Sequence, residues 1–374
     1  MFISPAFAHG GAVGTSTGGL GRIFLIAIAA VILFVLFLVF THEKKGWTVL
    51  VTGGAGYVGS ALVPKLLERG HRVTVLDLYL YGEDVLDGVR DHADLQEIKG
   101  DLRDPHAVDV ALRGCDAVIH LACISNDPSY DLDPGLGKSV NYDAFRPLVR
   151  AAKKAGVKRF IYASSFSVYG VKDEPEGTED LPREPLTGCS RYKALCEKVL
   201  DEERAPGFVT CTVRPAAVCG HAPRQRLDII VNTLTNHAVN QGRIRVFGGS
   251  QKRSCIHIDD MVDLYLFLLD QPDALIDGKT YDAGYETQTV LDLADIVKRV
   301  VGGDLPIDIE PKDGLRSYPA SSDRLRRELG FKPRHTIEDA VRDLAAAFRN
   351  GKIPDSFDDP RYFNIKMMQR VGLE

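Results

Sequence analysis

The sequence predicts an α/β fold in which helices cover both faces of a doubly wound parallel sheet. Short runs that are apolar throughout alternate with amphipathic helical stretches between residues 47 and 214. Strands buried on both faces of a parallel sheet have this continuous apolar pattern, and their alternation with helices is typical of the class. A chain of 374 residues with 45% hydrophobic residues has ample apolar side chains for such a core. One transmembrane helix is predicted before this fold, and a smaller mixed α/β region after its main strands.

The predicted transmembrane helix is residues 23–40, a run of eighteen apolar residues without a charge. About 20 such residues span the ~30 Å hydrocarbon core of a bilayer. A buried core helix fits less well, because such a helix is rarely apolar around its whole circumference. A signal peptide also fits less well, because the run is long and no small-residue cleavage site follows it. Residues 1–22, with six glycines, are predicted to be flexible.

The charges beside the span predict its orientation. Lys44 and Lys45 follow it, whereas only Arg22 precedes it. Cytoplasmic flanks carry an excess of Lys and Arg, so we expect a single-pass protein with its large C-terminal part in the cytoplasm.

Composition excludes other classes of partner. The chain has 46 Lys and Arg against 51 Asp and Glu, a net charge of −5. Phosphate-backbone binding needs a basic face, so we expect no nucleic-acid partner. The seven cysteines show no CxxC and no Cys/His ligand spacing, so no metal site is predicted.

Five apolar runs are the predicted strands of the sheet. They cover residues 47–52, 72–76, 116–121, 157–163 and 208–213. Predicted helices cover residues 60–69, 138–155, 190–204 and 259–270, and two more begin at the N-caps Thr289 and Thr336. We therefore expect a main domain over 47–214, a mainly substrate-binding region over 215–350 that is interleaved with it, and an extended tail over 351–374.

Three glycines, Gly53, Gly56 and Gly59, lie between the first predicted strand and its helix. Glycines allow a tight turn and close approach of the backbone to a pyrophosphate, and the helix N-terminus offers free N–H groups to its charge. Asp77 ends the second strand, 18 residues after Gly59, where a carboxylate binds the hydroxyls of an adenosine ribose. A carboxylate there repels a 2′-phosphate. The pattern thus predicts a Rossmann domain that binds NAD rather than NADP.

Further motifs follow in a fixed order along residues 47–345. They are Thr52–Ser60 (TGGAGYVGS), Gly100–Asp104 (GDLRD), Val118–Ala122 (VIHLA), Asn141, Ser164–Gly170 (SSFSVYG), Arg214-Pro215, Arg253–Asp260 (RSCIHIDD) and Arg316–Tyr318 (RSY). Together they resemble the extended short-chain dehydrogenase/reductase family, and within it the NAD-dependent nucleotide-sugar epimerases and dehydratases.

The resemblance implies which residues contact the cofactor. Tyr57 and Val58 would bind it together with the glycine turn and Asp77. Asp101 and Leu102 would hold the adenine, and Pro215 would lie beside the nicotinamide. The residues implied to line the rest of the cleft are Leu121, Ala122 and Asn141.

The resemblance also implies a catalytic Ser, Tyr and Lys, the last two as Tyr-x-x-x-Lys on one helix. Ser165 matches the Ser, which orients the reacting hydroxyl of the sugar. Lys193 matches the Lys, which lowers the pKa of the Tyr and binds the nicotinamide ribose. The position of the Tyr, four residues before Lys193, holds Cys189 in this chain.

Cys189 differs from a Tyr mainly in length. A Tyr hydroxyl projects roughly 3–4 Å further than a Cys sulfur, and a base must come within ~2.6–3.2 Å of its proton. A thiol with an ordinary pKa of ~8.5 beside Lys193 ionises readily, so we expect reach rather than acidity to limit it. Tyr192 is an alternative base, but no Lys follows it at the required spacing, which favours a packing role. An altered enzyme, a non-catalytic NAD-binding protein and a functional substitute base all remain open.

Arg253 and Arg316 match positions at which the family binds a nucleotide diphosphate with arginines, whose guanidinium groups pair with phosphate in a bidentate manner. Surface ion pairs with nearby acids are the alternative for both. His257-Ile258-Asp259-Asp260 is predicted to begin a helix rather than to bind a metal.

Two functions fit these observations. The first is a membrane-anchored, NAD-dependent enzyme that epimerises a nucleotide sugar or performs related hydride-transfer chemistry. The second is a non-catalytic NAD-binding accessory subunit of a membrane protein complex. Cys189 and the membrane span favour the second function, whereas the retained Ser165, Lys193 and arginines favour the first. By resemblance, helices 138–155 and 190–204 would also pair in a homodimer.

Overall fold

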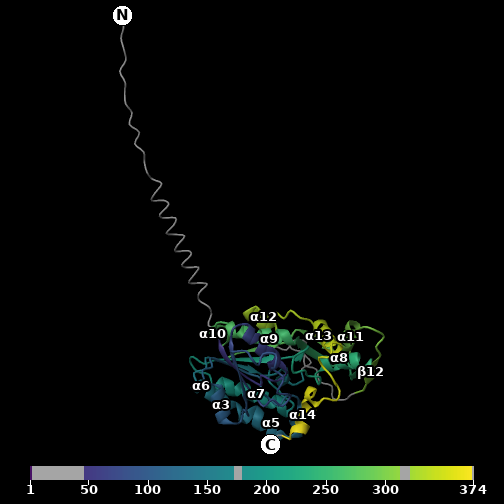
Figure 1. The fold of residues 1–374 in the computed structure, drawn as a ribbon, viewed down its shortest axis with the longest axis horizontal. Helices are drawn as coiled ribbons and strands as arrows, with labels where there is room; N and C mark the ends of the chain where they lie inside the picture. The colour runs from purple at the N-terminus through teal and green to yellow at the C-terminus, as the bar shows by residue number, and fades with distance from the viewer. Residues whose placement is uncertain (2–45, 172–178, 312–320, 373–374) are drawn as a thin grey trace. The chain divides into compact units, whose positions relative to one another are not determined.

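The central sheet of the described residues has seven parallel strands in the order β10-β6-β5-β4-β1-β2-β3 (Figure 1). Its strands are β1 (Thr48–Thr52), β2 (Arg72–Asp77), β3 (Leu95–Lys99), β4 (Ala117–His120), β5 (Arg159–Ala163), β6 (Val209–Pro215) and β10 (Lys279–Ala283). The computed structural model describes residue 1 and residues 46–171, 179–311 and 321–372. All five predicted strands are confirmed, as β1, β2, β4, β5 and β6.

The N-terminal predictions fall elsewhere in the chain. The predicted membrane span 23–40 and the predicted flexible segment, apart from residue 1, lie outside the described residues. Among the helices that the structure describes, none is long and apolar enough to cross a bilayer.

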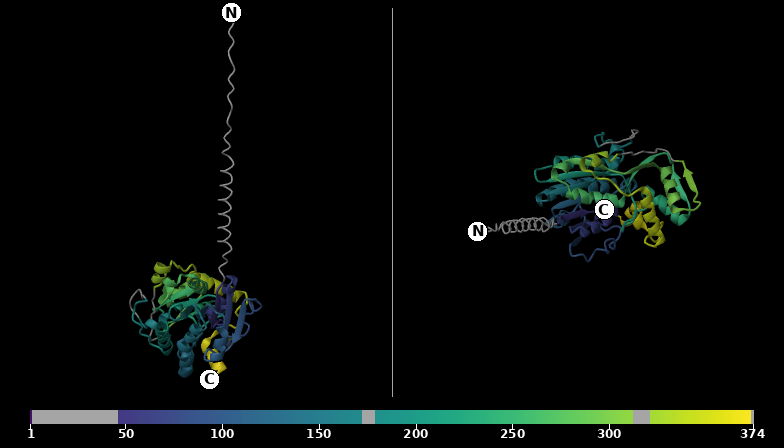
Figure 2. Two further views of the ribbon diagram at one scale, coloured as in Figure 1. Left: turned by 90° about the vertical axis from the view of Figure 1, so that its left-hand side faces the viewer. Right: turned by 90° about the horizontal axis from the view of Figure 1, so that it is seen from above.

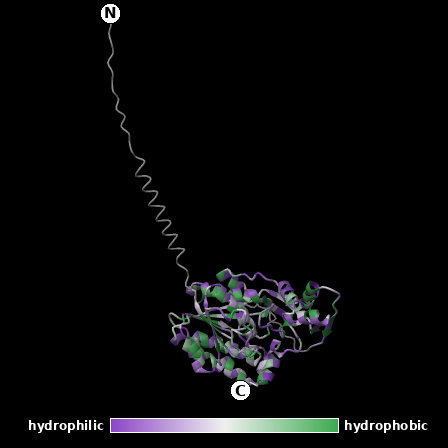
Figure 3. Ribbon diagram, in the orientation of Figure 1, coloured by the Kyte–Doolittle hydropathy of each residue, from purple (hydrophilic) through white to green (hydrophobic). Residues whose placement is uncertain are grey.

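Alternate strand residues point to opposite faces of the sheet, and helices cover both faces. Val49 and Val51 of β1 pack in one core with side chains of α2 (Tyr57–Glu68) and α9 (Ile258–Asp270). Leu50 packs in a second core with α3 (Pro105–Ala111), α6 (Phe145–Lys154) and α7 (Gly188–Glu202). Figures 1 and 3 show α9 on one side of the sheet, α3, α6 and α7 on the other, and hydrophobic residues between them. The doubly wound architecture is therefore confirmed.

Two strands of the sheet are absent from the predicted set. β3 (LQEIK) lies at the sheet edge and is only half-buried, so it lacks a continuous apolar pattern. β10 (KTYDA) occupies the opposite edge and pairs with β6 alone. The exposed side chains of β3 remove the apolar pattern there, whereas β10 is buried from Tyr281 to Ala283 but its run is interrupted by Asp282.

A smaller mixed α/β region covers one end of the sheet. Its helices α8 (Ile230–Gln241), α11 (Val290–Val301) and α13 (Ile337–Arg349) share a separate core. Two small sheets belong to it, β7 (Ala217–Cys219) with β9 (Lys252–His257) and β11 (Glu286–Thr289), and β8 (Ile244–Phe247) with β12 (Ile307–Glu310). Thr289 and Thr336 cap α11 and α13 in reciprocal capping boxes with Asp292 and Asp339.

The predicted helix over 138–155 is divided in the structure. It comprises the end of α5 (Pro134–Lys138), the π-helical turn η1 (Ser139–Asp143) and α6. α7 begins at Gly188 because Thr187 caps it by accepting a hydrogen bond from the N–H of Ser190. The remaining elements are α4 (Asp127–Leu132), η2 (Phe166–Tyr169), α10 (Asp273–Ile276), α12 (Asp323–Leu329), η3 (Pro360–Tyr362) and α14 (Asn364–Val371).

The C-terminal segment corrects the prediction of an extended tail over 351–374. Residues 360–371 form η3 and α14, and Tyr362, Asn364, Met367 and Met368 are buried. α14 packs against α4, and Met368 shares a small core with Ile124 (Figure 2, yellow). The apolar residues of this segment follow no clear period, and the segment is buried through contacts with distant parts of the chain: Ile353 and Tyr362 join a core with Leu344 and Phe348, and Asn364 makes polar contacts.

Candidate functional site

The order of the strands places a crevice at the carboxyl ends of β1 and β4. β2 and β3 follow β1 on one side of it in the sheet. The chain then crosses back, and β4 lies on the other side of β1. Ligands of open α/β sheets bind at this reversal of strand order. Gly53, Asp77, Leu121 and Ser165 each follow or end a strand at this edge of the sheet.

The glycine turn is sterically closed to larger residues. Gly53 has a φ of +75°, and a Cβ there would lie 2.7 Å from the backbone nitrogen of Ala122. A Cβ on Gly59 would lie 2.3 Å from the carbonyl oxygen of Gly53. Gly56 is the N-cap residue of α2 and makes no side-chain cap, so the first N–H groups of the helix face the crevice without an internal acceptor. This geometry supports the predicted phosphate-binding turn.

Asp77 lies beside this turn, as predicted. Its two carboxylate oxygens accept hydrogen bonds from the N–H of Ala55 at 3.0 Å and of Tyr79 at 2.8 Å. Burial raises the pKa of Asp77 above its ordinary value, and these two N–H groups counteract that effect. Each oxygen keeps a second lone pair for a ribose hydroxyl.

The other predicted cofactor residues lie at the ends of the neighbouring strands. Asp101 follows β3 and forms an ion pair with Arg103 at 2.7 Å, and Leu102 is buried in the core. Leu121 and Ala122 follow β4 and are half-buried. Asn141 has a more specific role than lining the cleft. Its side chain accepts from the N–H of Ile124 at 2.8 Å and donates to the Ile124 carbonyl at 2.9 Å, which fixes the loop after β4.

Ser165 and Lys193 lie close together at the end of β5. Lys193 is buried, and its Nζ donates to the carbonyl of Ala163 at 2.6 Å. Ser165, two residues later, caps η2 by accepting a hydrogen bond from the N–H of Ser167 at 3.1 Å. Its hydroxyl also accepts from the hydroxyl of Ser167 at 2.9 Å. Two of the implied catalytic groups are therefore in place beside the crevice.

Cys189 is less acidic than the sequence argument assumed. The residue is 9% exposed, and its Sγ lies 3.8 Å from the carbonyl oxygen of Ile124. Burial raises the pKa of the Cys189 thiol to about 12, and the charge of Lys193 offsets only part of that rise. The expectation that acidity does not limit Cys189 is therefore wrong, because desolvation of the thiolate outweighs one neighbouring cation.

Tyr192 lies in a cluster of aromatic rings. Its ring stacks on Tyr142 with centroids 5.3 Å apart and contacts Tyr130 at 6.0 Å. These contacts support the packing role that the sequence favoured. The ring of Tyr130 fits between α5 and α7 because Gly137 and Gly188 leave room for it.

A buried ion-pair network, which the sequence reasoning did not identify, holds α7 against the sheet. Glu197 is 2% exposed, and its carboxylate pairs in a bidentate manner with Arg214 of β6 at 2.9 Å and 2.7 Å. Arg183 donates to the same carboxylate at 2.9 Å. Glu197 follows Lys193 by one helical turn, so the network fixes the helix that carries Lys193. The only sequence signal for it was the four-residue spacing.

The predicted substrate residues are partly described. Arg253 lies on β9, is half-buried, and donates through Nη1 to the carbonyl of Lys252 at 2.9 Å. Arg316 lies outside the described residues. Pro215 ends β6 opposite Ala283 of β10, at the same edge of the sheet as the crevice.

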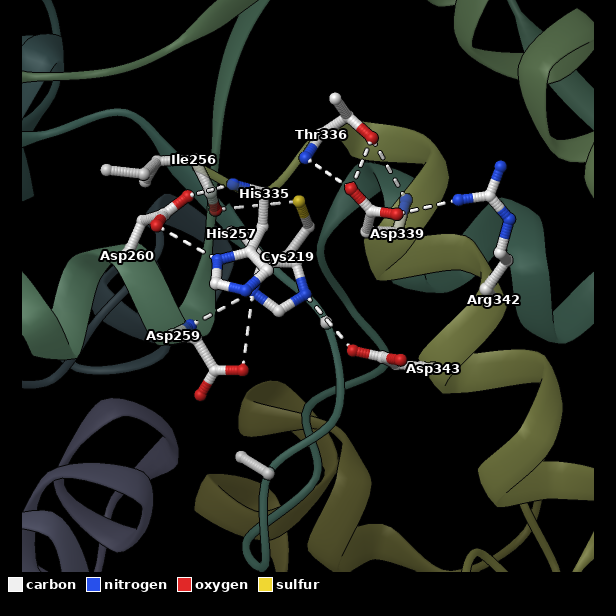
Figure 4. A network of polar contacts seen from close by, with 12 residues as sticks. Cys219, Ile256, His257, Asp259, Asp260, His335, Thr336, Asp339, Arg342 and Asp343 are labelled. Atoms are coloured by element: carbon white, nitrogen blue, oxygen red, sulfur yellow. Dashed lines mark hydrogen bonds and ion pairs between the residues drawn. The ribbon is translucent and has the colours of Figure 1, made fainter. Parts of the chain in front are cut away.

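His257 is the N-cap residue of α9, which confirms the helix start predicted at 257–260. Its Nδ1 accepts a hydrogen bond from the N–H of Asp259 at 3.1 Å, and its Nε2 lies 3.3 Å from Asp343 of α13 (Figure 4). The three side chains have metal-ligand spacing, with donor atoms within 4.8 Å of one another. Because Nδ1 is an acceptor, however, the neutral ring carries its proton on Nε2, where a metal would need a lone pair. Asp259 is also paired with Lys65 at 2.7 Å. The arrangement fits a helix cap tied to α13 better than a metal centre.

The sequence pattern of the NAD dependent epimerase/dehydratase family matches residues 49–284. A UDP-glucose 4-epimerase from Lactobacillus helveticus is 30% identical over 341 residues, which cover 83% of this chain and 99% of that one. A dTDP-glucose 4,6-dehydratase from Streptomyces niveus is 26% identical, covering 81% of this chain and 93% of that one.

Among solved structures, DesIV from Streptomyces venezuelae superposes with a TM-score of 0.74 at 26% identity. The match covers 82% of this chain and 98% of DesIV, a dTDP-glucose 4,6-dehydratase crystallised with NAD and TYD bound.

Proposed function

Because the chain belongs to the NAD dependent epimerase/dehydratase family, we propose that it binds NAD and a nucleotide sugar and is impaired in proton transfer by Cys189. The observation that carries the proposal is the buried thiol at the position of the family base, beside an otherwise retained site. The relatives named above act on UDP-glucose and dTDP-glucose, so a nucleotide hexose is the proposed class of substrate.

The crevice fits a dinucleotide. The Cβ-free turn at Gly53 and Gly59 lets a pyrophosphate approach the first turn of α2, and Asp77 is placed to accept hydrogen bonds from a ribose. When bound, NAD supplies the acceptor and donor of a hydride. The chain's own residues then bind, orient and exchange protons with the sugar.

Ser165 and Lys193 have roles that their positions support. The Ser165 hydroxyl orients the reacting hydroxyl of the sugar, and the Lys193 ammonium binds the ribose next to the nicotinamide and favours anions near it. Glu197 and Arg214 keep Lys193 in place from beneath α7. These groups provide binding and orientation, which contribute part of the catalytic rate without a base.

Cys189 is the weak point of this arrangement. A thiol with a pKa of about 12 is ionised in only about one molecule in 10⁵ at pH 7. A positioned base contributes typically ~10²–10⁴-fold to a rate, and this contribution is what we expect the chain to lack.

A second candidate function follows from the same observation. A chain that binds NAD without a working base is suited to be a non-catalytic accessory subunit of a membrane protein complex. Tethering through residues 23–40 and association into a homodimer through α6 and α7 belong to the proposal as predictions from the sequence.

Substitution at position 189 tests the proposal. We expect the purified full-length chain to turn over UDP-glucose or dTDP-glucose slowly, and Cys189→Tyr to raise kcat by about 10²-fold because it restores an ionisable hydroxyl. Cys189→Phe is the matched control, since it adds the ring without the hydroxyl and should give no gain.

Three results decide between the functions. Equal rates for the native chain and Cys189→Tyr mean that the thiol is a competent base, and the proposed impairment is then wrong. A gain in Cys189→Tyr alone supports an impaired enzyme. Binding of NAD by both chains with turnover by neither supports the accessory subunit.

A further inference from the structure

A cavity of about 450 Å³ lies beside α2. Its walls come from α2, the loop after β2, the segment 223–225 and the C-terminal segment. Its lining residues include Tyr81, Gly88, Arg224, Lys352, Arg361 and Tyr362. Of the predicted cofactor, catalytic and substrate residues that the structure describes, none lines it. Cavities of this size are typical of small-molecule sites.

Arg224 is the unusual residue of this cavity. It is 4% exposed, and its guanidinium lies over the ring of Tyr81 at 3.7 Å. Nη2 donates to the side-chain oxygen of Asn364 at 2.5 Å, whereas Nε has no hydrogen-bond partner among the described residues. Burial lowers the pKa of Arg224 to about 10. The guanidinium therefore stays charged at neutral pH in a place where its charge is poorly solvated.

The charge of Arg224 is not matched by an ion pair. Its hydrogen-bonded partner Asn364 is neutral, and among the described residues no carboxylate lies within 4.0 Å of its guanidinium, although the charges of Asp228 and Asp77 act on it from further away. A buried cation without a paired anion is costly, and a bound anion would relieve that cost. Arginine is also the side chain best suited to bind phosphate or carboxylate, because its donors form a planar fork.

The other charged residues of the cavity leave a cationic excess. The carboxylate of Asp84 is paired with Arg361, whose Nη1 lies 3.5 Å away. Arg361 also forms an ion pair with Asp359 at 2.8 Å. Lys352 is exposed and also lines the cavity. Arg224 and Lys352 thus both supply positive charge to the cavity.

The remaining walls are apolar or aromatic. Val85, Leu86 and Val89 line one side, and the rings of Tyr81 and Tyr362 lie on others. Such walls favour a flat or apolar group attached to the anion, because aromatic rings and prolines exclude water around it.

We propose that this cavity is a second ligand site, for a small organic anion with a phosphate or carboxylate group on a ring. Arg224 and Lys352 bind the anionic group, and the tyrosines and valines contact the ring. No described residue assigned to the dinucleotide lines the cavity, although the charge of Arg224 acts on Asp77, and we expect both ligands to bind at once. The cavity is linked to α2 because the backbone N–H of Arg224 donates to the hydroxyl of Ser60, a residue of α2, at 3.1 Å.

Calorimetric titration of the full-length chain with phenyl phosphate tests the site. Benzoate separates carboxylate from phosphate ligands, and benzyl alcohol is the neutral control. We expect phenyl phosphate to bind, to bind about tenfold more tightly than benzyl alcohol, and to keep its affinity within about threefold when NAD is saturating.

Variants of the wall make the test specific. Arg224→Gln should weaken phenyl phosphate about tenfold, and Lys352→Gln about threefold. Gly88 lines the cavity and an added Cβ there meets no atom within 4 Å, so we expect Gly88→Phe to place its ring at the cavity and to weaken binding about tenfold. Lys332→Gln, an exposed lysine that does not line the cavity, is the matched control for Lys352→Gln and should change nothing.

Several results would overturn the proposal. They are the absence of phenyl phosphate binding, equal binding of benzyl alcohol, displacement of phenyl phosphate by NAD, or unchanged affinity in Gly88→Phe and Lys352→Gln. The last two variants decide the outcome if Arg224→Gln does not fold, since neither alters a buried polar contact. Because the readout is binding rather than turnover, it does not depend on the activity proposed above.

Discussion

Gly59 shows how one atom decides the chemistry of the crevice. A Cβ at Gly59 would lie 2.3 Å from the carbonyl oxygen of Gly53. Only glycine therefore fits at this point of the turn, at the start of α2. Cys189 is the opposite case, since we propose that one side chain there weakens an expected function. Burial opposes ionisation of its thiol.

At this scale, Gly59→Ala should abolish NAD binding. The added methyl group must displace the backbone of Gly53 or Gly54, which distorts the turn that approaches the pyrophosphate. We expect calorimetry to show at least a ~100-fold loss of NAD affinity. Gly88→Ala is the matched control, because a Cβ at Gly88 meets no atom within 4 Å. Unaltered NAD affinity in Gly59→Ala would show that the turn does not bind the pyrophosphate.

At the scale of elements, α7 is the helix on which the site depends. It carries Cys189 and Lys193 toward the crevice, and Glu197 ties it to β6. Its C-terminus is anchored separately, because Glu203 pairs with Arg146, Arg150 and Lys153 of α6. Both anchors are ionic, so the position of α7 depends on these ion pairs.

This anchoring gives a pH-dependent prediction. Hydrogen bonding from Lys153, with further help from Arg150 and Arg146, lowers the pKa of Glu203 to about 2 from an ordinary value of 4.5. A carboxylate with a depressed folded-state pKa stabilises the fold above its unfolded pKa, and this contribution is lost as the pH falls through the folded value. The contribution of Glu203 is therefore complete above about pH 4.5 and lost toward about pH 2.

Glu203→Gln should lower the free energy of unfolding at pH 7 by about 1–2 kcal/mol, since the cationic partners are partly exposed. Thermal unfolding at several pH values checks this. The difference in Tm between the native chain and Glu203→Gln should shrink between pH 4.5 and 2. A difference that stays constant over that window would show that Glu203 does not titrate with a depressed pKa.

At the scale of the molecule, the C-terminal segment joins parts of the fold that are distant in sequence. Asn364 donates from its backbone to Asp228 at 2.9 Å, and its side chain donates to the hydroxyl of Ser125 at 2.7 Å. It also receives the hydrogen bond from Arg224. One residue near the end of the chain therefore connects the loop after β4 to the wall of the proposed anion site.

The predicted membrane anchor is also a property of the whole molecule. We expect the full-length chain to sediment with membranes and to resist extraction by carbonate. Val31→Lys with Val35→Lys should release it, because each charge near the centre of a span costs about 2.5–3.5 kcal/mol. Val31→Leu with Val35→Leu is the control and should stay in the membrane fraction. Retention of the lysine variant would contradict a transmembrane span at 23–40.

The sequence by itself determined the inner sheet, the glycine turn with Asp77 and the retained Ser165 and Lys193. These features depend on local patterns: apolar runs, glycines between a strand and a helix, and fixed spacing along one helix. The edge strands lack such a pattern, β3 because many of its side chains are exposed and β10 because polar residues, among them the buried Asp282, interrupt its apolar run.

The tertiary structure alone decided the acidity of Cys189, the burial of Arg224 and the folding of residues 360–371 onto the domain. Each of these depends on desolvation and on partners far apart in the chain, such as Arg224 and Asn364, which are 140 residues apart. Solvation and long-range polar contacts leave no periodic trace in a sequence, since they are set by which segments pack together and not by which residues are neighbours.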